Sequence, residues 1–246
     1  MEKEINNFFN DRYSILILLI VSLITIFLSN LIYNYEILLS TQDSSNYILL
    51  AKDLKNYFNV PHQDALRIFP SLLAFFLNKM GIDIDISFKI LAYFSFIFLN
   101  IKLFLLIKSY NIKNYLALSA VAIIIYSNHS IIYSVFNYYQ LVDLITYILI
   151  IYFIELLRNK NHILLFLISL ISIFTKEYLL VLVFTIYGKY IYDNKTTKNI
   201  FLLILILIIF LVHNKFASLN YYNDKINDDD LIFLIKSYFN DVNLFI

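Results

Sequence analysis

The chain has 246 residues, of which 61% are hydrophobic and only 15% are charged, and such a composition has too few charges to cover a water-exposed surface. Two glycines and two prolines leave little room for the turns of an all-β fold, and the lack of cysteine excludes disulfides, thiol catalysis and cysteine-ligated metals. The net charge of +1 does not produce a strong positive field, so it gives no argument for a nucleic-acid-binding protein. Repeated Leu, Ile and Phe runs instead predict one all-α membrane domain over residues 1–246, a polytopic bundle of transmembrane helices.

Seven apolar runs are candidate spans, since crossing a bilayer takes about 20 apolar residues, and somewhat fewer in a helix bundle whose ends are hydrated. The first run, residues 13–33, has a mixed-charge flank and no cleavage pattern, so we expect a retained helix rather than a signal peptide. The remaining spans fill residues 87–212. They are residues 87–107, 115–126, 141–157, 162–175, 178–191 and 199–212.

The charges between these runs predict their direction by the positive-inside rule. If the amino terminus lies inside, every short inner loop is net basic, while the outer segments 34–86, 127–140 and 213–246 are mixed or acidic. We therefore expect seven spans, a cytoplasmic amino terminus and a carboxyl terminus outside, in an outer tail that begins at residue 213. The basic residues of the inner loops are Lys108, Lys113, Arg158, Lys160, Lys189, Lys195 and Lys198.

The first outer segment, residues 34–86, is too long and too patterned for a simple loop. At residues 47–58 apolar side chains recur at helical spacing with polar ones opposite, which predicts an amphipathic helix at the membrane surface. A second helix is expected to begin at Pro70, to run to Lys79 and to stop at Gly81. At roughly 15 Å it covers half a bilayer, so we expect it to lie on the outer face rather than to cross.

Charged residues at the outer ends of the spans are candidates for chemistry, because a charge in a membrane is costly unless it is paired, hydrated or functional. Asp43 directly precedes the amphipathic helix and is either its N-cap or a general base. Arg67, before Pro70, either snorkels to lipid headgroups or binds a lipid phosphate. Nearby, His62 and Asp64 are interpreted as solvated loop residues.

Two further candidates lie at the outer ends of later spans. Lys176 and Glu177 separate two short runs, and they form either a self-contained ion pair or a site in which the lysine binds phosphate. Asp143 begins its span after a loop that contains His129. The favoured interpretation of Asp143 is a helix cap, and the alternative is the rim of an active site.

Other patterns are weaker. Glu155 is expected to pair with Arg158 on the same helix, three residues later. Residues 83–85 spell Asp-x-Asp, but they suggest a strand-like or helix-start segment rather than a metal site, and the four histidines show no metal-ligand spacing. With two glycines, nucleotide binding by a P-loop or Rossmann turn is excluded.

Taken in chain order, these motifs resemble those of the GT-C glycosyltransferases, integral-membrane enzymes that use polyprenyl-phosphate sugars. In that superfamily a first span leads to a long outer loop with an acidic residue near its start and membrane-parallel helices after it. Asp43-x3-Tyr47-x3-Ala51 and residues 67–73 (RIFPSLL) look like the Asp…Tyr…Ala and Tyr-Arg-x-Leu-Pro-Pro-Leu segments of bacterial members. Val142-Asp143 and residues 174–177 (FTKE) look like two later landmarks, Val/Leu-Asp and Leu-Thr-Lys-Glu.

The resemblance covers residues 13–191 and implies a seven-span membrane module in a bacterial inner membrane. It implies an inverting transfer of a hexose or pentose from a polyprenyl-phosphate donor to a glycan, lipid or protein acceptor at the outer face. Asp43 would be the catalytic base, and Arg67 and Lys176 would bind the lipid phosphate. The supporting residues would be Tyr47, His129, Asp143 and Glu177.

The resemblance leaves several points open. Whether a divalent metal assists is not determined, and no cofactor is implied with certainty. Family members are commonly longer, so the chain is expected to be a short or truncated member. The main alternative is a non-catalytic GT-C-like membrane subunit or scaffold. A polysaccharide polymerase or a transporter is a further alternative, although the chain lacks the inverted repeats and Gly/Pro-broken spans of transporters.

Overall fold

The computed structural model describes residues 11–32, 42–159, 161–194 and 197–223. Every regular element in these ranges is helical, and none of these residues forms a strand, as the composition predicted. Most of the predicted outer tail, residues 224–246, lies outside the described residues.

Among the described residues, four helices are long and apolar enough to cross a membrane: α2 (Asp11–Ile32), α7 (Ile84–Lys108), α10 (Leu141–Arg158) and α13 (Thr197–Asn223). They confirm the apolar runs predicted at the corresponding places in the sequence. The chain therefore has the helices of an integral membrane protein. Helix α13 continues well past the expected end at residue 212.

A bent pair of helices counts as a fifth span if its two parts are taken together. Helix α8 (Asn114–Ser127) meets α9 (His129–Phe136) at an angle of 70°. The bend lies at Asn128, whose backbone is extended and whose side-chain oxygen accepts hydrogen bonds from the amides of Ser130 and Ile131. Asn128 thus starts a new helix. The predicted outer loop 127–140 is largely helical, since α9 is followed by the 3₁₀ helix η2 (Tyr138–Gln140).

The remaining apolar helices are shorter than a usual span. Helices α11 (His162–Ile173) and α12 (Leu180–Asn194) have 12 and 15 residues, and the 3₁₀ helix η3 (Glu177–Leu179) joins them. Since about 20 residues cross the hydrocarbon core, length and composition give four or five spans in the described part of the chain. The predicted number of about seven is not confirmed.

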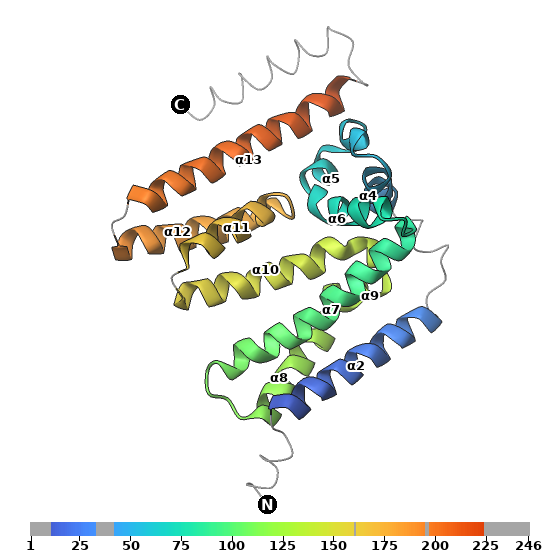
Figure 1. Cartoon of the computed structure of the whole chain (residues 1–246), viewed down its shortest axis with the longest axis vertical. Helices are drawn as coiled ribbons and strands as arrows, with labels where there is room; N and C mark the ends of the chain where they lie inside the picture. The colour runs from blue at the N-terminus through green and yellow to red at the C-terminus, as the bar shows by residue number, and fades with distance from the viewer. Residues whose placement is uncertain (1–10, 33–41, 160, 195–196, 224–246) are drawn as a thin grey trace, which may run out of the picture.

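The helices are arranged so that the molecule has two distinct ends (Figure 1). Helices α7, α10 and α13 cross the view, and the connection from α7 to α8, the end of α10, the start of α11, the end of α12 and the start of α13 lie toward the left. The short helices of the first loop gather toward the right. We call these the connection end and the first-loop end. Lys108, Arg158 and Lys198 lie at the ends of helices that meet at the connection end.

The described part of the first loop, from residue 42 on, contains four short helices: α4 (Gln42–Lys52), η1 (Leu54–Phe58), α5 (His62–Leu66) and α6 (Ile68–Lys79). The predicted amphipathic helix is broken at Asp53, which has an extended backbone and caps η1 by accepting from the amide of Lys55. The apolar side of α4 is buried, with Tyr47, Leu50 and Ala51 almost fully covered.

The second predicted helix of this loop is confirmed as α6. Pro70 is its third residue, within the first turn, where a proline is tolerated because its missing N–H has no helical partner. The helix ends before Gly81, which has a φ of 91°, a conformation open to glycine and strained for other residues. Twelve residues in length, α6 packs against α4 and α7.

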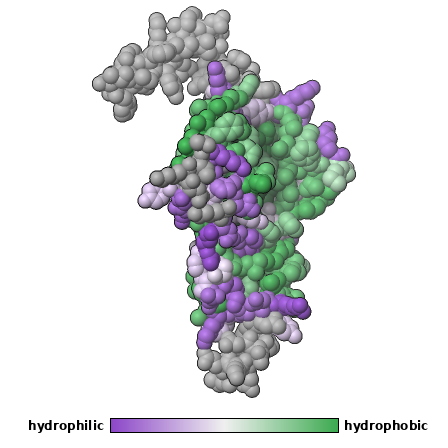
Figure 2. All heavy atoms as spheres, turned by 60° about the vertical axis from the view of Figure 1, so that its left-hand side comes forward, coloured by the Kyte–Doolittle hydropathy of each residue, from purple (hydrophilic) through white to green (hydrophobic). Residues whose placement is uncertain are grey.

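The outside of the bundle is strongly apolar. Exposed side chains include Phe27 on α2, Phe94 on α7 and Phe201 and Leu211 on α13, each more than half exposed. Figure 2, which turns the connection end forward, shows wide apolar areas beside a polar band. An apolar exterior of this kind is suited to lipid rather than to water.

Two interpretations of charged residues are wrong because the true partners are distant in the sequence. Glu155 accepts both 2.9 Å hydrogen bonds from the ammonium of Lys102 on α7, whereas Arg158 donates to the backbone and side chain of Ser109. Asp64 is only 5% exposed, so the interpretation of this residue as a solvated loop residue is wrong.

The residues around Asp64 tie the first loop to the bundle. The carboxylate of Asp64 accepts a 2.6 Å hydrogen bond from Asn46 on α4. His62 is half-buried, and its ring nitrogen lies 2.9 Å from the side-chain oxygen of Asn214 on α13. These contacts hold α4, α5 and the end of α13 together.

Candidate functional site

The site is built around the break between α11 and η3, at residues 174–177. Helix α11 ends at Ile173, and the amides of Thr175 and Lys176 both donate back to the carbonyl of Ser172. The backbone of Lys176 is then extended, with φ −154° and ψ 127°. The carbonyl of Phe174 accepts a 2.9 Å hydrogen bond from the amide of Phe69, which fastens this break to the first turn of α6.

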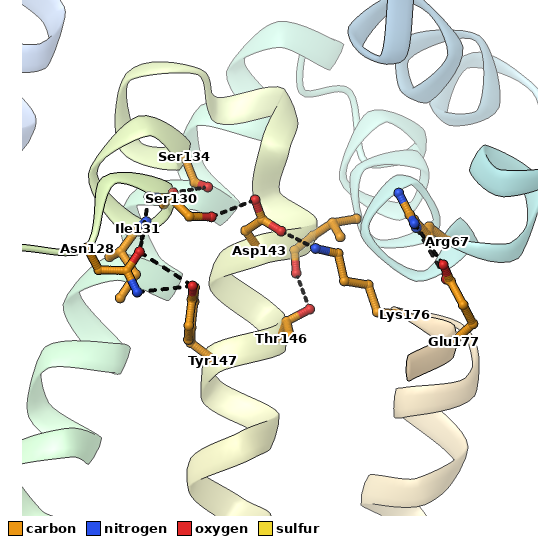
Figure 3. A network of polar contacts seen from close by, with 11 residues as sticks. Arg67, Asn128, Ser130, Ile131, Ser134, Asp143, Thr146, Tyr147, Lys176 and Glu177 are labelled. Carbon is orange, nitrogen blue, oxygen red and sulfur yellow. Dashed lines mark hydrogen bonds and ion pairs between the residues drawn. The ribbon is translucent and has the colours of Figure 1, made fainter. Parts of the chain in front are cut away.

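The side chain of Lys176 points toward α10 and forms an ion pair with Asp143 (Figure 3). These side chains are 16% and 20% exposed. The second carboxylate oxygen of Asp143 accepts a 3.0 Å hydrogen bond from the hydroxyl of Ser130 on α9. The favoured interpretation of Asp143 as a helix cap is wrong, because the cap position of α10 belongs to Gln140.

The side chain of Glu177 pairs with Arg67, which lies at the junction of α5 and α6. Its two oxygens lie 2.8 Å and 3.4 Å from Nη2 and Nε of the guanidinium, an arrangement in which two N–H groups face one carboxylate. Tyr47 of α4 lies close enough to Arg67 to contribute to the raised pKa of its guanidinium. Three elements of the first loop thus meet η3 at this pair.

Burial and charge act against each other in this second pair. Burial by itself would lower the pKa of Arg67, but its hydrogen bond with Glu177 and the carboxylate charge outweigh burial and raise that pKa. Burial would raise the pKa of Glu177, but the hydrogen bond from Arg67 and the charges of Arg67 and Lys176 lower it. Both groups are therefore charged at neutral pH.

Lys176 and Glu177 do not form the self-contained ion pair that was one interpretation of the sequence. Successive side chains of an extended segment point to opposite sides, and the extended backbone at Lys176 sends its side chain to α10 while Glu177 turns toward α6 (Figure 3). Two residues adjacent in the sequence thereby connect two separate parts of the bundle. We call Arg67, Asp143, Lys176 and Glu177 the four-charge cluster.

The structure places the other predicted site residues less directly. Asp43 is the second residue of α4, one helical turn before Tyr47, and its side chain lies outside the described part of the structure. The prediction that Asp43 is a general base therefore stays a prediction. His129 is exposed at the start of α9, and its ring stacks on Tyr133 with 5.8 Å between centroids.

One residue of the site was missed at the sequence level. Ser130 bonds to Asp143, and its amide is held by the cap residue Asn128. The side chain of Asn128 in turn donates to the hydroxyl of Tyr147 at 3.1 Å. The sequence feature that could have identified Ser130 is the Asn-x-Ser pattern at residues 128–130. An asparagine in this position is typical of a helix cap, and the serine then lies in the first turn of the helix.

The four-charge cluster has a net charge of zero but keeps spare hydrogen-bond donors. An ammonium has three N–H donors and a guanidinium has five, so one carboxylate does not exhaust either cation. An anionic group could therefore share Lys176 or Arg67 with its carboxylate. No group of three or more His, Cys, Asp or Glu residues suited to a metal ion occurs in residues 11–32, 42–159, 161–194 and 197–223.

The conclusions on function rest on this geometry and on the order of the motifs. The chain matches no family model, no curated protein and no solved structure.

Proposed function

We propose that the chain is a glycosyltransferase of the GT-C type, which moves a sugar from a polyprenyl-phosphate donor to an acceptor at the outer face of a bacterial inner membrane. The proposal also includes the seven-span arrangement, with α11 and α12 as short spans and the first-loop end outside. The observation that carries it is the meeting of Arg67, Asp143, Lys176 and Glu177, which come from three separate motifs of the chain.

The arrangement of the motifs supports this proposal because they are far apart in the sequence and near one another in space. Arg67 lies 110 residues before Glu177, and Asp143 lies 33 residues before Lys176. Paired charges at the end of an apolar bundle are expensive to maintain without a role. Cations beside a membrane are also suited to a phosphate group that arrives on a lipid.

In the proposed reaction, the carboxylate of Asp43 takes the proton of an acceptor hydroxyl. The acceptor oxygen then forms a bond with the anomeric carbon, and the bond from that carbon to the phosphate oxygen breaks. The electron pair leaves with the polyprenyl phosphate, whose added charge is stabilised by Arg67 or Lys176. One displacement of this kind inverts the anomeric centre.

A second candidate, a non-catalytic membrane subunit or scaffold, is favoured by one observation. Both cations of the cluster already have a carboxylate partner, and those pairs connect the first loop, α10 and η3. A purely structural role would require nothing more. The two candidates differ in their dependence on Asp43, because no pair in the described cluster involves this residue.

The test is donor turnover by the full chain in membrane vesicles. Synthetic undecaprenyl-phosphate hexoses and pentoses are added, and release of undecaprenyl phosphate is measured in the presence of cell-envelope acceptors. The variant Asp43→Asn is expected to abolish release at unchanged expression. The matched control Asp53→Asn changes another aspartate of the same loop, and it is expected to keep the wild-type rate because asparagine also caps a helix.

The outcomes separate the two candidates. Donor turnover that is lost in Asp43→Asn and retained in Asp53→Asn supports the enzyme. Equal turnover in the wild type and Asp43→Asn removes the assignment of the base. No turnover with any donor of the panel, from a well-folded wild-type chain, favours the scaffold.

A further inference from the structure

A cavity that is open to the surface lies at the connection end of the bundle, away from the four-charge cluster. It has a volume of about 520 Å³ and is lined by Asn159, Asn161, His162, Ile163 and Lys198. These residues come from the junction of α10 with α11 and from the start of α13. The volume lies within the range of roughly 300–1,000 Å³ that is usual for ligand pockets.

The wall of this cavity is held by buried polar contacts. The ring of His162 lies 2.8 Å from the side-chain oxygen of Asn199, which is fully buried. The edge of that ring meets Tyr190, another fully buried residue, at 5.2 Å between centroids. The hydroxyl of Tyr190 donates to the carbonyl of Asn159 at 3.0 Å. The cavity is therefore a preformed feature in which His162 and Asn159 have fixed positions.

The polar groups of the lining favour an anion. Lys198 is exposed and forms no ion pair with any carboxylate in the part of the chain that the structure describes. Asn159 and Asn161 are exposed, and their side-chain N–H₂ groups are hydrogen-bond donors. None of the described residues that line the cavity carries a carboxylate. A phosphate group would find a point charge and neutral donors, with no like charge to repel it.

The setting of the cavity favours a lipid as the source of that phosphate. Ile163 lines the cavity and is 73% exposed. Phe201 on α13, within a turn of Lys198, is 66% exposed. Polar residues gather at this end of the molecule beside the apolar flank (Figure 2). Basic pockets between membrane helices, at the level of the headgroups, are suited to anionic lipids.

We propose that this cavity binds the phosphate of an anionic phospholipid headgroup, with Lys198 as the counter-ion and Asn159 and Asn161 as hydrogen-bond donors. The first acyl carbons lie against Ile163. The site is independent of sugar transfer at the first-loop end. Its role is to fix the position of α11 and α13, whose first turns both border the cavity, relative to the membrane surface.

The test measures lipid binding to the purified full chain by native mass spectrometry. Phosphatidylglycerol and phosphatidylcholine with the same acyl chains are the probes. Lys198→Gln is expected to weaken phosphatidylglycerol binding by about tenfold, the effect of losing one charge-assisted contact. The matched control Lys215→Gln, at the far end of α13, is expected to leave it unchanged. Lys198→Arg is expected to retain most of the binding.

Competition identifies the source of the phosphate. Retention of bound phosphatidylglycerol in the presence of millimolar glycerol 3-phosphate supports a lipid site. Displacement of the phosphatidylglycerol assigns the site to soluble phosphate compounds and overturns the proposal that it binds a lipid. Phosphatidylcholine that binds as tightly as phosphatidylglycerol also overturns the proposal. So does an equal loss of binding in Lys198→Gln and Lys215→Gln.

Discussion

The ion pair between Lys176 and Asp143 is expected to stabilise the bundle measurably. Lys176→Met removes the ammonium and leaves the carboxylate of Asp143 with the hydroxyl of Ser130 as its one partner among the described residues. Surface pairs are worth about 0–1 kcal/mol, and breaking a buried pair costs about 3–5 kcal/mol. With side chains 16% and 20% exposed, the pair lies between these limits, so we expect a loss of about 2 kcal/mol.

The assay is thermal unfolding of the full chain in detergent micelles. For a chain of this size about 1 kcal/mol shifts the Tm by roughly 2–4 °C, so Lys176→Met should lower the Tm by about 4–8 °C. Asp143→Asn removes the charge that needs a counter-ion. In that background Lys176→Met should cost less than half as much, because the two residues are coupled.

A matched control separates this coupling from the general effect of removing a lysine. Lys79, on α6, is exposed, and Lys79→Met should change the Tm by less than about 1–2 °C in either background, as expected for a surface substitution. Strictly additive losses for Lys176→Met and Asp143→Asn would refute the assigned pairing. A loss in Lys79→Met as large as in Lys176→Met would refute it as well.

Two further predictions concern the other ion pairs. Because Arg67 lowers the pKa of Glu177 in the folded state, this carboxylate stabilises the fold above the ordinary glutamate pKa and loses that effect as the pH falls through its lowered value. The Tm difference between wild type and Glu177→Gln should therefore shrink between about pH 7 and pH 3. A Tm difference that grows on acidification would contradict this prediction. Lys102→Met should destabilise the bundle by about 2 kcal/mol because it leaves Glu155 without its counter-ion, and the double variant with Glu155→Gln should recover most of that loss in the same melting assay; no recovery would show that the pair with Glu155 is misassigned.

The long helices were predictable because the bilayer demands an uninterrupted apolar run. Helix α7 begins three residues before its predicted start and ends one residue beyond its predicted end. The end of α13 was missed because His213 and Asn214 interrupt the apolar run. In the fold these polar residues are satisfied by the first loop, where His213 bonds to the carbonyl of Leu66 and Asn214 contacts His62.

The charged residues of the site were recognised one by one, but their partners were not. Lys176 and Glu177 look like a local pair in the sequence, and only the extended backbone at Lys176 shows that they diverge. Similarly, Glu155 has a basic residue three positions later, yet its partner Lys102 lies on another helix. Pairing across helices depends on packing, which short-range spacing does not report.

The proposed side of the membrane is tested most directly by single cysteines, since the natural chain contains none. Met80→Cys places a thiol just after α6, at the first-loop end, where the native side chain is 77% exposed. Tyr110→Cys places one between α7 and α8, at the connection end, where the native side chain is 54% exposed.

Intact bacteria that express each variant are treated with a membrane-impermeant maleimide, before and after permeabilisation. If the four-charge cluster faces outward, the thiol at position 80 reacts in intact cells and the thiol at position 110 reacts only after permeabilisation. Labelling of position 110 in intact cells, with position 80 protected, would place the cluster in the cytosol and contradict the proposed transfer at the outer face.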